Sequence, residues 1–232
     1  MLFLHEVHQI RGRAEEEFEA AYRDTWMPVL GRGDDARLLW FLHHAHGGDG
    51  HDVVCGTGAV RDGAAWERLA ARTFDGDLAA WAKRLDELRH DVSAKILVPV
   101  AWSPMRELDL GSVPVEPTDH ELSIYMEDTG WPAASVEDYT DFWETSYYGP
   151  MRAVKESLLD IQGVFRVAWG TGRRKEAVLM QKVTDHKGLL RLLVTEVPAA
   201  YRTPGTFMYD ALDYRDRWES KLLRTTAWSP LY

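Results

Sequence analysis

Two histidines, a tyrosine and an arginine are the residues of this sequence whose types suit proton-transfer chemistry on a small organic molecule. We predict that His5 or His43 acts as a base, because unperturbed imidazole titrates near ~6.5 and small shifts poise it at neutral pH. Tyr125 or Arg166 would donate a hydrogen bond to the oxyanion that results. Such a set suits the removal of a proton from a phenol or an activated C–H group.

A structural role is the alternative for the same residues. A strand histidine such as His5 can be hydrogen-bonded inside a core without reacting. Glu127 and Arg166 would equally form a buried ion pair that has no catalytic role. Both interpretations stay open at the level of the sequence.

The first strand of each half must position most of these side chains. Apolar runs at residues 2–7 and 122–127 predict these strands, in which alternate side chains share one face. The aliphatic face should meet helices, and we align His5 with Tyr125 as counterparts on the opposite face. That face, which combines polar and apolar groups as a small-molecule pocket does, carries Phe3, His5, Tyr125 and Glu127.

The second strand of each half completes the predicted pocket. We place Phe41, His43 and Arg166 on its pocket face, and Trp40 and Phe165 on its helix face. Trp102 and Trp228 end the last strands and would wall the two mouths. The predicted substrate-binding residues are therefore Phe3, Phe41, Glu127, Trp102 and Trp228. A slip of one residue in register would invert every face.

A group of histidines flanks one predicted turn and raises the question of a metal. Neutral imidazoles bind zinc, iron or copper, and the group consists of His43, His44, His46 and His51. However, His43 and His44 are adjacent in a strand and point to opposite faces. A polar, solvated hairpin tip explains the same residues. We expect no metal and no cofactor, and a histidine-ligated metalloenzyme remains an alternative.

The sequence contains an internal repeat. KILVPVAWSPM (95–105) and KLLRTTAWSPL (221–231) share Lys, Leu, Ala, Trp, Ser and Pro in register. Before each motif comes the same predicted order of strand, acidic aromatic helix, two strands around a turn, and helix. We therefore predict a first repeat at 1–105, a Pro-containing linker at 106–120 and a second repeat at 121–232.

Each repeat reads β-α-β-β-α-β, which forms an antiparallel sheet with both helices on one face. The other face of the sheet is bare and needs a cover. Two repeats in one chain can pack their bare faces together and close a barrel-like core. The predicted fold is α+β: two tandem ferredoxin-like units that form an intramolecular dimeric α/β barrel, with a small-molecule pocket in the seam.

This order of elements, the repeat and the two WSP strand ends resemble the NIPSNAP-like branch of the dimeric α/β-barrel (ferredoxin-like) superfamily, over about 2–105 and 122–231. The resemblance implies a small-molecule fold used by cofactor-free monooxygenases, polyketide cyclases, lactone isomerases and heme enzymes. Some cyclases of this fold place a histidine on the first strand, as His5 is here. The second half holds only His120 and His186, neither in a stretch resembling a heme-ligand segment, so we expect no heme.

The function expected from these observations is a cofactor-independent oxygenase or a cyclase/isomerase that acts on a hydrophobic, aromatic or polyketide-like compound. Fold alone does not choose the chemistry. The alternatives are a non-enzymatic small-molecule-binding or assembly protein, and the metalloenzyme named above.

Composition narrows the classes of partner. The 232 residues carry 27 Lys+Arg and 37 Asp+Glu, a net charge of −10, which opposes binding to a nucleic-acid backbone. The single cysteine, Cys55, excludes an internal disulfide. The N-terminal apolar run is broken at His5 and Glu6, and no run approaches ~18 apolar residues. We expect a cytoplasmic protein with no membrane partner, and exposed strand edges would allow a homodimer.

Overall fold

The computed structural model of the protein describes residues 1–45, 52–154, 157–173 and 175–232, with the backbone alone for 52–59. The first repeat contains β1 (Leu2–Ile10), α1 (Glu15–Ala21), α2 (Met27–Gly31), β2 (Arg37–His44), β3 (Asp52–Val60), α3 (Gly63–Phe74), α4 (Ala79–Leu88) and β4 (Arg89–Pro99). The second contains β5 (Ile124–Pro132), α5 (Val136–Trp143), α6 (Gly149–Ala153), β6 (Leu159–Val167), β7 (Ala177–Val183), α7 (His186–Val194), α8 (Phe207–Asp210) and β8 (Arg215–Thr225).

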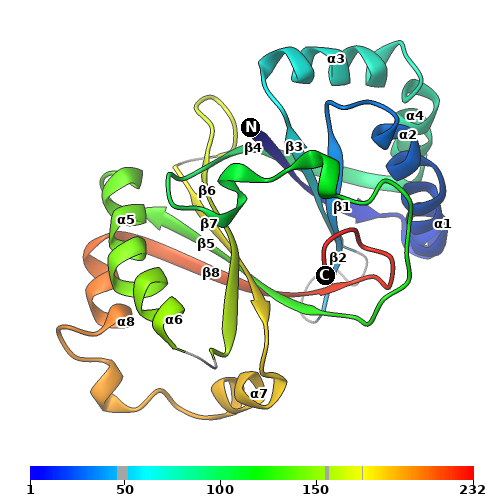
Figure 1. The fold of residues 1–232 in the computed structure, drawn as a ribbon. Helices are drawn as coiled ribbons and strands as arrows, with labels where there is room; N and C mark the ends of the chain where they lie inside the picture. Colours follow the sequence, from blue (N-terminus) through cyan, green and yellow to red (C-terminus); the bar gives the residue numbers. More distant parts are fainter. Residues whose placement is uncertain (46–51, 155–156, 174) are drawn as a thin grey trace.

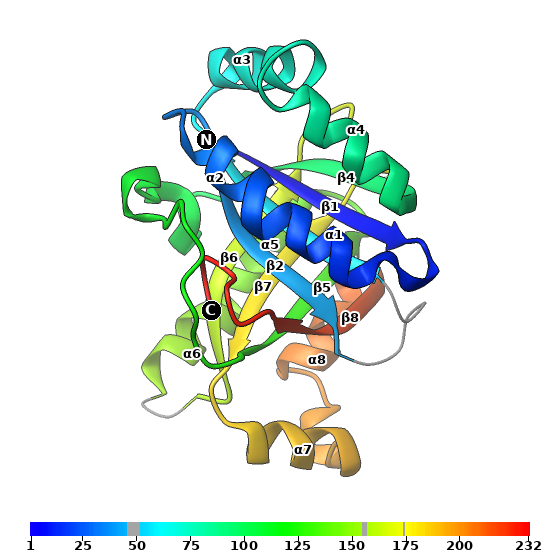
Figure 2. The same ribbon diagram turned by 90° about the vertical axis from the view of Figure 1, so that its right-hand side faces the viewer.

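The strands close into one barrel in the order β1-β3-β2-β8-β5-β7-β6-β4, and every neighbouring pair is antiparallel. Each repeat contributes four consecutive strands, and the β2–β8 and β4–β6 pairings join the repeats. The helices of the two repeats lie outside the barrel on opposite sides (Figure 1), and α1 and α2 cross the outer face of the first repeat (Figure 2). The predicted tandem α+β barrel is confirmed.

The two seams between the repeats are short. β2 pairs with β8 at three positions and β4 pairs with β6 at three, so most of each of these strands has a strand partner on one side only. The expectation of a homodimer through exposed strand edges stays a prediction. None of the helices in the described ranges has the length and apolar character needed to cross a membrane.

The strand pairing identifies which residues of the two repeats correspond. His5 pairs with Lys95 between β1 and β4, and Glu127 pairs with Lys221 between β5 and β8. Because Lys95 and Lys221 begin the two repeated motifs, His5 and Glu127 are counterparts. The predicted correspondence of His5 with Tyr125 is therefore wrong. It was aligned on the start of an apolar run, whereas β5 begins only at Ile124.

A π-helical turn precedes a proline at the same place in each repeat. The turns span Tyr22–Trp26 and Glu144–Tyr148, immediately before helices whose second residue is Pro28 or Pro150. Proline has no N–H and its ring clashes with the carbonyl four residues earlier. The wider turn, in which the Met27 N–H bonds to the Tyr22 carbonyl, accommodates the ring. Two helical segments thus continue across a helix-breaking residue.

The repeated AWSP motif fastens each repeat to the other. The Ser103 hydroxyl, which follows β4, accepts a hydrogen bond from the Val164 N–H of β6 at 3.0 Å. The Ser229 hydroxyl, which follows β8, accepts one from the Phe41 N–H of β2 at 3.1 Å. Both serines are buried, so each hydroxyl satisfies a backbone donor that water does not reach.

The sequence predicted that the two tryptophans of the motif wall the mouths of the barrel, and this prediction is wrong. Trp102 packs among the helices of the second repeat, with its ring 4.8 Å from that of Tyr148. Trp228 packs among the helices of the first repeat, 4.9 Å from Phe41. The strand before each tryptophan ends at the boundary between the repeats. Each indole therefore packs against the helices of the other repeat.

The linker closes one end of the barrel. Leu110 and Val113 are buried against the core inside the barrel, which includes Phe3 and Leu97. Further along, Val115 lies against Gly31 at the end of α2: a Cβ built on Gly31 would come within 2.6 Å of the Val115 Cβ. The segment between the repeats is thus a plug at one end of the barrel.

Candidate functional site

The centre of the barrel holds a buried histidine–carboxylate pair. The His5 Nε2–H donates a hydrogen bond to Glu127 Oε2 at 2.7 Å. His5 is 6% exposed and Glu127 is 1% exposed. β1 and β5 are four positions apart in both directions around the ring, so this bond spans the barrel between opposite walls.

Two lysines flank the pair, and they differ in how firmly they are held. The Lys95 ammonium lies 2.6 Å from Glu176 Oε2. The Lys221 ammonium lies 3.8 Å from Glu127 Oε1 and 3.6 Å from Glu219 Oε1. Burial alone would raise the pKa of Glu127, but His5, Lys221 and Lys95 outweigh it and hold the pKa below its usual range. Glu127 is therefore ionised at neutral pH.

One side of the pair is apolar. Phe3 packs on Phe165 with ring centroids 4.9 Å apart, and Trp40 packs edge-on to Tyr125 at 6.2 Å. Burial raises the pKa of Tyr125 to about 12, so its hydroxyl keeps its proton at neutral pH. This apolar core, together with the linker, closes that end of the barrel.

The other side leads to solvent through charged residues. The Lys221 side chain is 31% exposed although its ammonium faces buried Glu127. Ser93 of β4, two residues from Lys95, is exposed. At this end of the barrel, charged side chains therefore run from buried Glu127 through Lys221 to partly exposed Glu219.

Four of the predicted residues share the barrel interior. Phe3 and Tyr125 belong to its apolar core, and His5 and Glu127 form the central pair. The prediction of the interior face was therefore correct for β1 and β5. Their catalytic roles stay a prediction.

Three predicted residues lie outside the barrel, which corrects their placement. Phe41 packs among the helices of the first repeat. His43 contacts α1, with Nε2 3.2 Å from Glu19 Oε2. Arg166 is on the outer surface, where its guanidinium is 2.7 Å from Glu137.

The faces of β2 and β6 were inverted for an identifiable reason. β2 is buried on both faces from Arg37 to His43, so hydrophobicity does not mark which side is inside. The pairing register also shifts between Leu38 and Trp40 in β2 and between Ile161 and Gly163 in β6. A bulge inserts one residue and re-aims the side chains beyond it. As a result, Trp40 faces the interior and Phe41 does not.

The predicted histidine metal group is only partly visible. His43 lies against α1, and His46 and His51 lie outside the described residues. Among the residues that are described, no three or more His, Cys, Asp or Glu side chains are arranged to hold a metal ion. The metalloenzyme alternative stays a prediction.

A second buried histidine lies on β1, and it was not among the predicted site residues. His8 is fully buried on the helix side of β1, where the Arg89 guanidinium donates to Nδ1 at 2.8 Å and Tyr22 Oη lies 3.2 Å from Nε2. Burial, Arg89 and His5 lower the pKa of His8 to about 3, so it is neutral at pH 7 and a weak base. The period-2 alternation that places His5 inside also places His8 under α1.

The second repeat buries an acid on its helix side. The Gln181 side-chain amide donates to Asp128 Oδ2 at 2.7 Å, and Tyr147 donates to Gln181 Oε1 at 2.8 Å. Asp128 Oδ1 has no partner among the described residues. Burial raises the pKa of Asp128 to about 6, although the neighbouring Ser220 and Gln181 side chains act to lower it. Because hydrogen bonds do not fully offset the burial of this carboxyl group, Asp128 lowers the stability of the fold.

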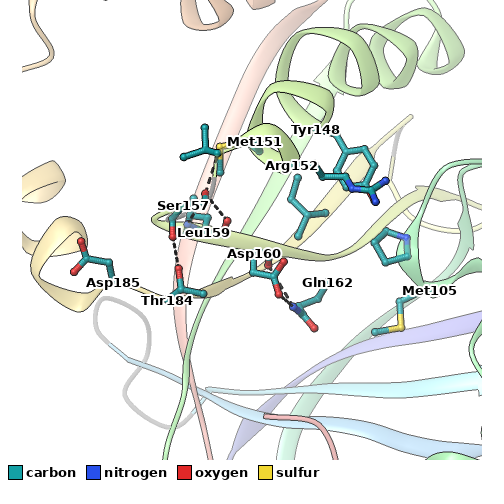
Figure 3. A pocket seen from close by; sticks show the side chains of 13 residues that line it. Met105, Tyr148, Met151, Arg152, Ser157, Leu159, Asp160, Gln162, Thr184 and Asp185 are labelled. Carbon is teal, nitrogen blue, oxygen red and sulfur yellow. Dashed lines mark hydrogen bonds between the residues drawn. The ribbon is translucent and has the colours of Figure 1, made fainter.

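Two pockets open on the second repeat, away from the central pair. The larger, of about 990 Å³, lies beside α6, β6 and the start of α7 (Figure 3). The smaller, of about 750 Å³, lies between α5 and residues 210–214. Neither contains His5 or Glu127, so the predicted pocket in the seam between the sheets is not one of them.

Comparison with known proteins shows the fold. No protein-family model and no curated protein matches the chain. A putative monooxygenase from Lactobacillus acidophilus superposes with a TM-score of 0.59 at 12% identity, over 99% of this chain and 96% of its own. An anthrone oxidase-like protein gives 0.57 at 8% identity, over 97% and 91%. An uncharacterised NIPSNAP domain protein from Burkholderia xenovorans gives 0.35 at 26% identity, over 44% and 97%.

The class defined by these observations is the dimeric α/β barrel of ferredoxin-like units. The first two structures match nearly the whole chain, and the ring of strands shows both units in one polypeptide. The chain is thus a tandem dimeric α/β-barrel protein.

Proposed function

We propose that this protein is a cofactor-independent oxygenase in which His5 is the general base. The observation that carries the proposal is the 2.7 Å hydrogen bond between His5 Nε2 and Glu127 Oε2 in the centre of the barrel. Because Glu127 accepts the proton of Nε2, the other ring nitrogen, Nδ1, is left as the acceptor. The carboxylate also stabilises the imidazolium that forms when Nδ1 takes a proton.

Two groups are suited to the negative charge that deprotonation creates. Lys221 is less firmly paired than Lys95, so its ammonium is the one that can turn to an oxyanion. The Tyr125 hydroxyl is protonated at neutral pH and donates from the apolar side. The substrate class is a hydrophobic aromatic ketone or phenol with an acidic C–H group, which enters by the charged end.

Anthrone is the probe of choice, and the anthrone oxidase-like structural neighbour supports it. His5 takes a proton from the methylene carbon opposite the carbonyl. The resulting carbanion reduces dioxygen, and a C–O bond forms. Loss of the second methylene hydrogen with cleavage of the O–O bond releases water and leaves anthraquinone, so one anthrone and one O₂ give one anthraquinone and one water.

The test measures oxygen consumption and anthraquinone absorbance with anthrone. We expect H5Q to lose at least a hundredfold of the rate, because general-base catalysis contributes about that factor. H90Q is the matched control, since His90 is an exposed histidine of β4. Equal rates for H5Q and H90Q, or a wild-type rate no faster than buffer, would reject the proposal.

A ligand-binding protein without turnover is the second candidate. It is favoured by the position of the two described pockets, neither of which reaches His5. Saturable binding of an aromatic ligand with no chemical change, and no effect of H5Q on it, would support this candidate over the oxygenase.

A further inference from the structure

We propose that the 990 Å³ pocket beside α6 and β6 binds a small organic carboxylate with an apolar, planar body. The inference concerns a place distinct from the central pair and does not depend on the oxygenase proposal. It rests on the guanidinium of Arg152, on the apolar residues among the lining, and on a comparison with the equivalent place in the first repeat.

Arg152 is the cation of this pocket. Its guanidinium lies 5.4 Å over the ring of Tyr148, which in turn packs on Trp102 at 4.8 Å. Stacking holds the plane of the guanidinium and leaves its N–H edge for an acceptor. Within the described ranges Arg152 has no ion pair or hydrogen bond, so that edge is available.

The two carboxylates of the pocket are already engaged. Asp160 Oδ2 accepts from the Gln162 side chain at 2.7 Å. Asp185 Oδ1 accepts from the Lys187 N–H at 3.0 Å and caps α7. In Figure 3, Tyr148 and Arg152 lie together and Asp185 lies on the opposite side of the pocket. Among the described lining residues Arg152 is the one cation, and it lies at the end of the pocket away from Asp185, where a ligand carboxylate fits.

The rest of the lining mixes apolar residues with the polar Ser157, Gln162 and Thr184. Its apolar members are Pro104, Met105, Met151, Val154, Leu159 and Ile161. Methionine side chains adapt to flat aromatic surfaces and contact them favourably. The volume is at the upper end of that typical for small-molecule sites, which is about 300–1,000 Å³.

The first repeat has a different occupant at the equivalent place. α2 and α6 are counterparts, each with proline as its second residue, and they end at Gly31 and Ala153. On the first repeat, the linker lays Val115 on Gly31 and so covers this place. Leu30, the counterpart of Arg152, is fully buried there. The first repeat thus has a buried leucine at this position, and the second repeat has an exposed arginine.

The test uses 2-naphthoate, titrated into the full chain and followed by calorimetry. We expect saturable binding of one molecule per chain, at least tenfold weaker binding to R152Q, and partial recovery in R152K. R166Q is the matched control, because Arg166 is a surface arginine of the adjacent β6. 2-Naphthalenemethanol, which lacks the carboxylate, should bind wild type as weakly as 2-naphthoate binds R152Q.

Methyl-labelled methionine locates the bound probe. Met151 lines the pocket, and Met180 is buried inside the barrel. We expect the Met151 methyl signal to shift with 2-naphthoate and the Met180 signal to stay. Absence of saturable binding, equal affinities of R152Q and R166Q, or a shift at Met180 instead of Met151 would each overturn the proposal. None of these outcomes bears on oxygen consumption with anthrone.

Discussion

Glu127 is the counterpart of His5 in the second repeat, and the two side chains meet inside the barrel at 2.7 Å. In a barrel of two identical chains, the residues related by the twofold axis would be the same. Two glutamates there would repel, and two histidines could not both be protonated without cost. Duplication within one chain removes that restriction, so each copy could supply a different half of an acid–base pair.

Removal of the central carboxylate should destabilise the fold. E127A leaves His5 buried without its acceptor, and we expect a loss of about 3 kcal/mol in the free energy of unfolding, as for other buried pairs that lose one member. E137A is the control, because Glu137 pairs with Arg166 at the surface, and it should change stability by less than about 1 kcal/mol. Urea denaturation checks both. Similar losses for the two variants would show that the central pair contributes no more than a surface pair.

His8 should make the protein less stable in mild acid. Its folded-state pKa is about 3, below the ~6.5 of the unfolded chain, so between these values the unfolded state binds more protons. The contribution of His8 to stability is thus present above ~6.5 and is lost as pH falls toward 3. The check is denaturation of wild type and H8Q from pH 7 to 4. The difference in unfolding free energy between them should shrink with falling pH; a constant difference would contradict the burial of a neutral His8.

Asp128 should change the stability with pH in the opposite direction to His8. Its folded-state pKa of about 6 lies above the ~3.9 of an unfolded aspartate, so the folded state binds the extra proton. Its contribution is fully present below ~3.9 and is lost as pH rises through 6. D128N removes the charge. The change that it makes in the free energy of unfolding should therefore be more favourable at pH 7 than at pH 4, by about 1–3 kcal/mol. Thermal unfolding at the two pH values measures this, with D138N, at an exposed aspartate, as control. A D128N effect that does not change between pH 4 and 7 would refute the raised pKa.

The two serines of the AWSP motifs should contribute separately. S103A leaves the Val164 N–H unpaired, and S229A leaves the Phe41 N–H unpaired. Each loss should cost about 1–3 kcal/mol, the penalty of a buried donor without a partner. The double variant should lose the sum, because the serines fasten opposite seams of the barrel. Denaturant titration of the three variants tests this, and a double variant no less stable than S103A would show that the seams are not independent.

The sequence by itself determined the repeat, the order of elements and the interior faces of β1 and β5. The motifs at 95–105 and 221–231 recur in register, and the polar residues His5 and Glu127 alternate with aliphatic ones that meet helices. The alternation placed His5 and Glu127 on the interior face, although the helix-side face also carries buried polar groups, His8 on β1 and Asp128 on β5. The barrel that these elements imply is the one observed.

Only the tertiary structure decided the rest. β2 is buried on both faces and contains a register shift, so no local pattern distinguishes Phe41 outside from Trp40 inside. The partner of His5 depended on the register of β1 and β5 against strands about 90 residues away in the chain, and register follows from packing of the whole sheet. Likewise, the linker packs on Gly31 at the end of α2, and the pocket lies beside the equivalent helix α6. This difference depends on contacts between segments that are distant in the chain.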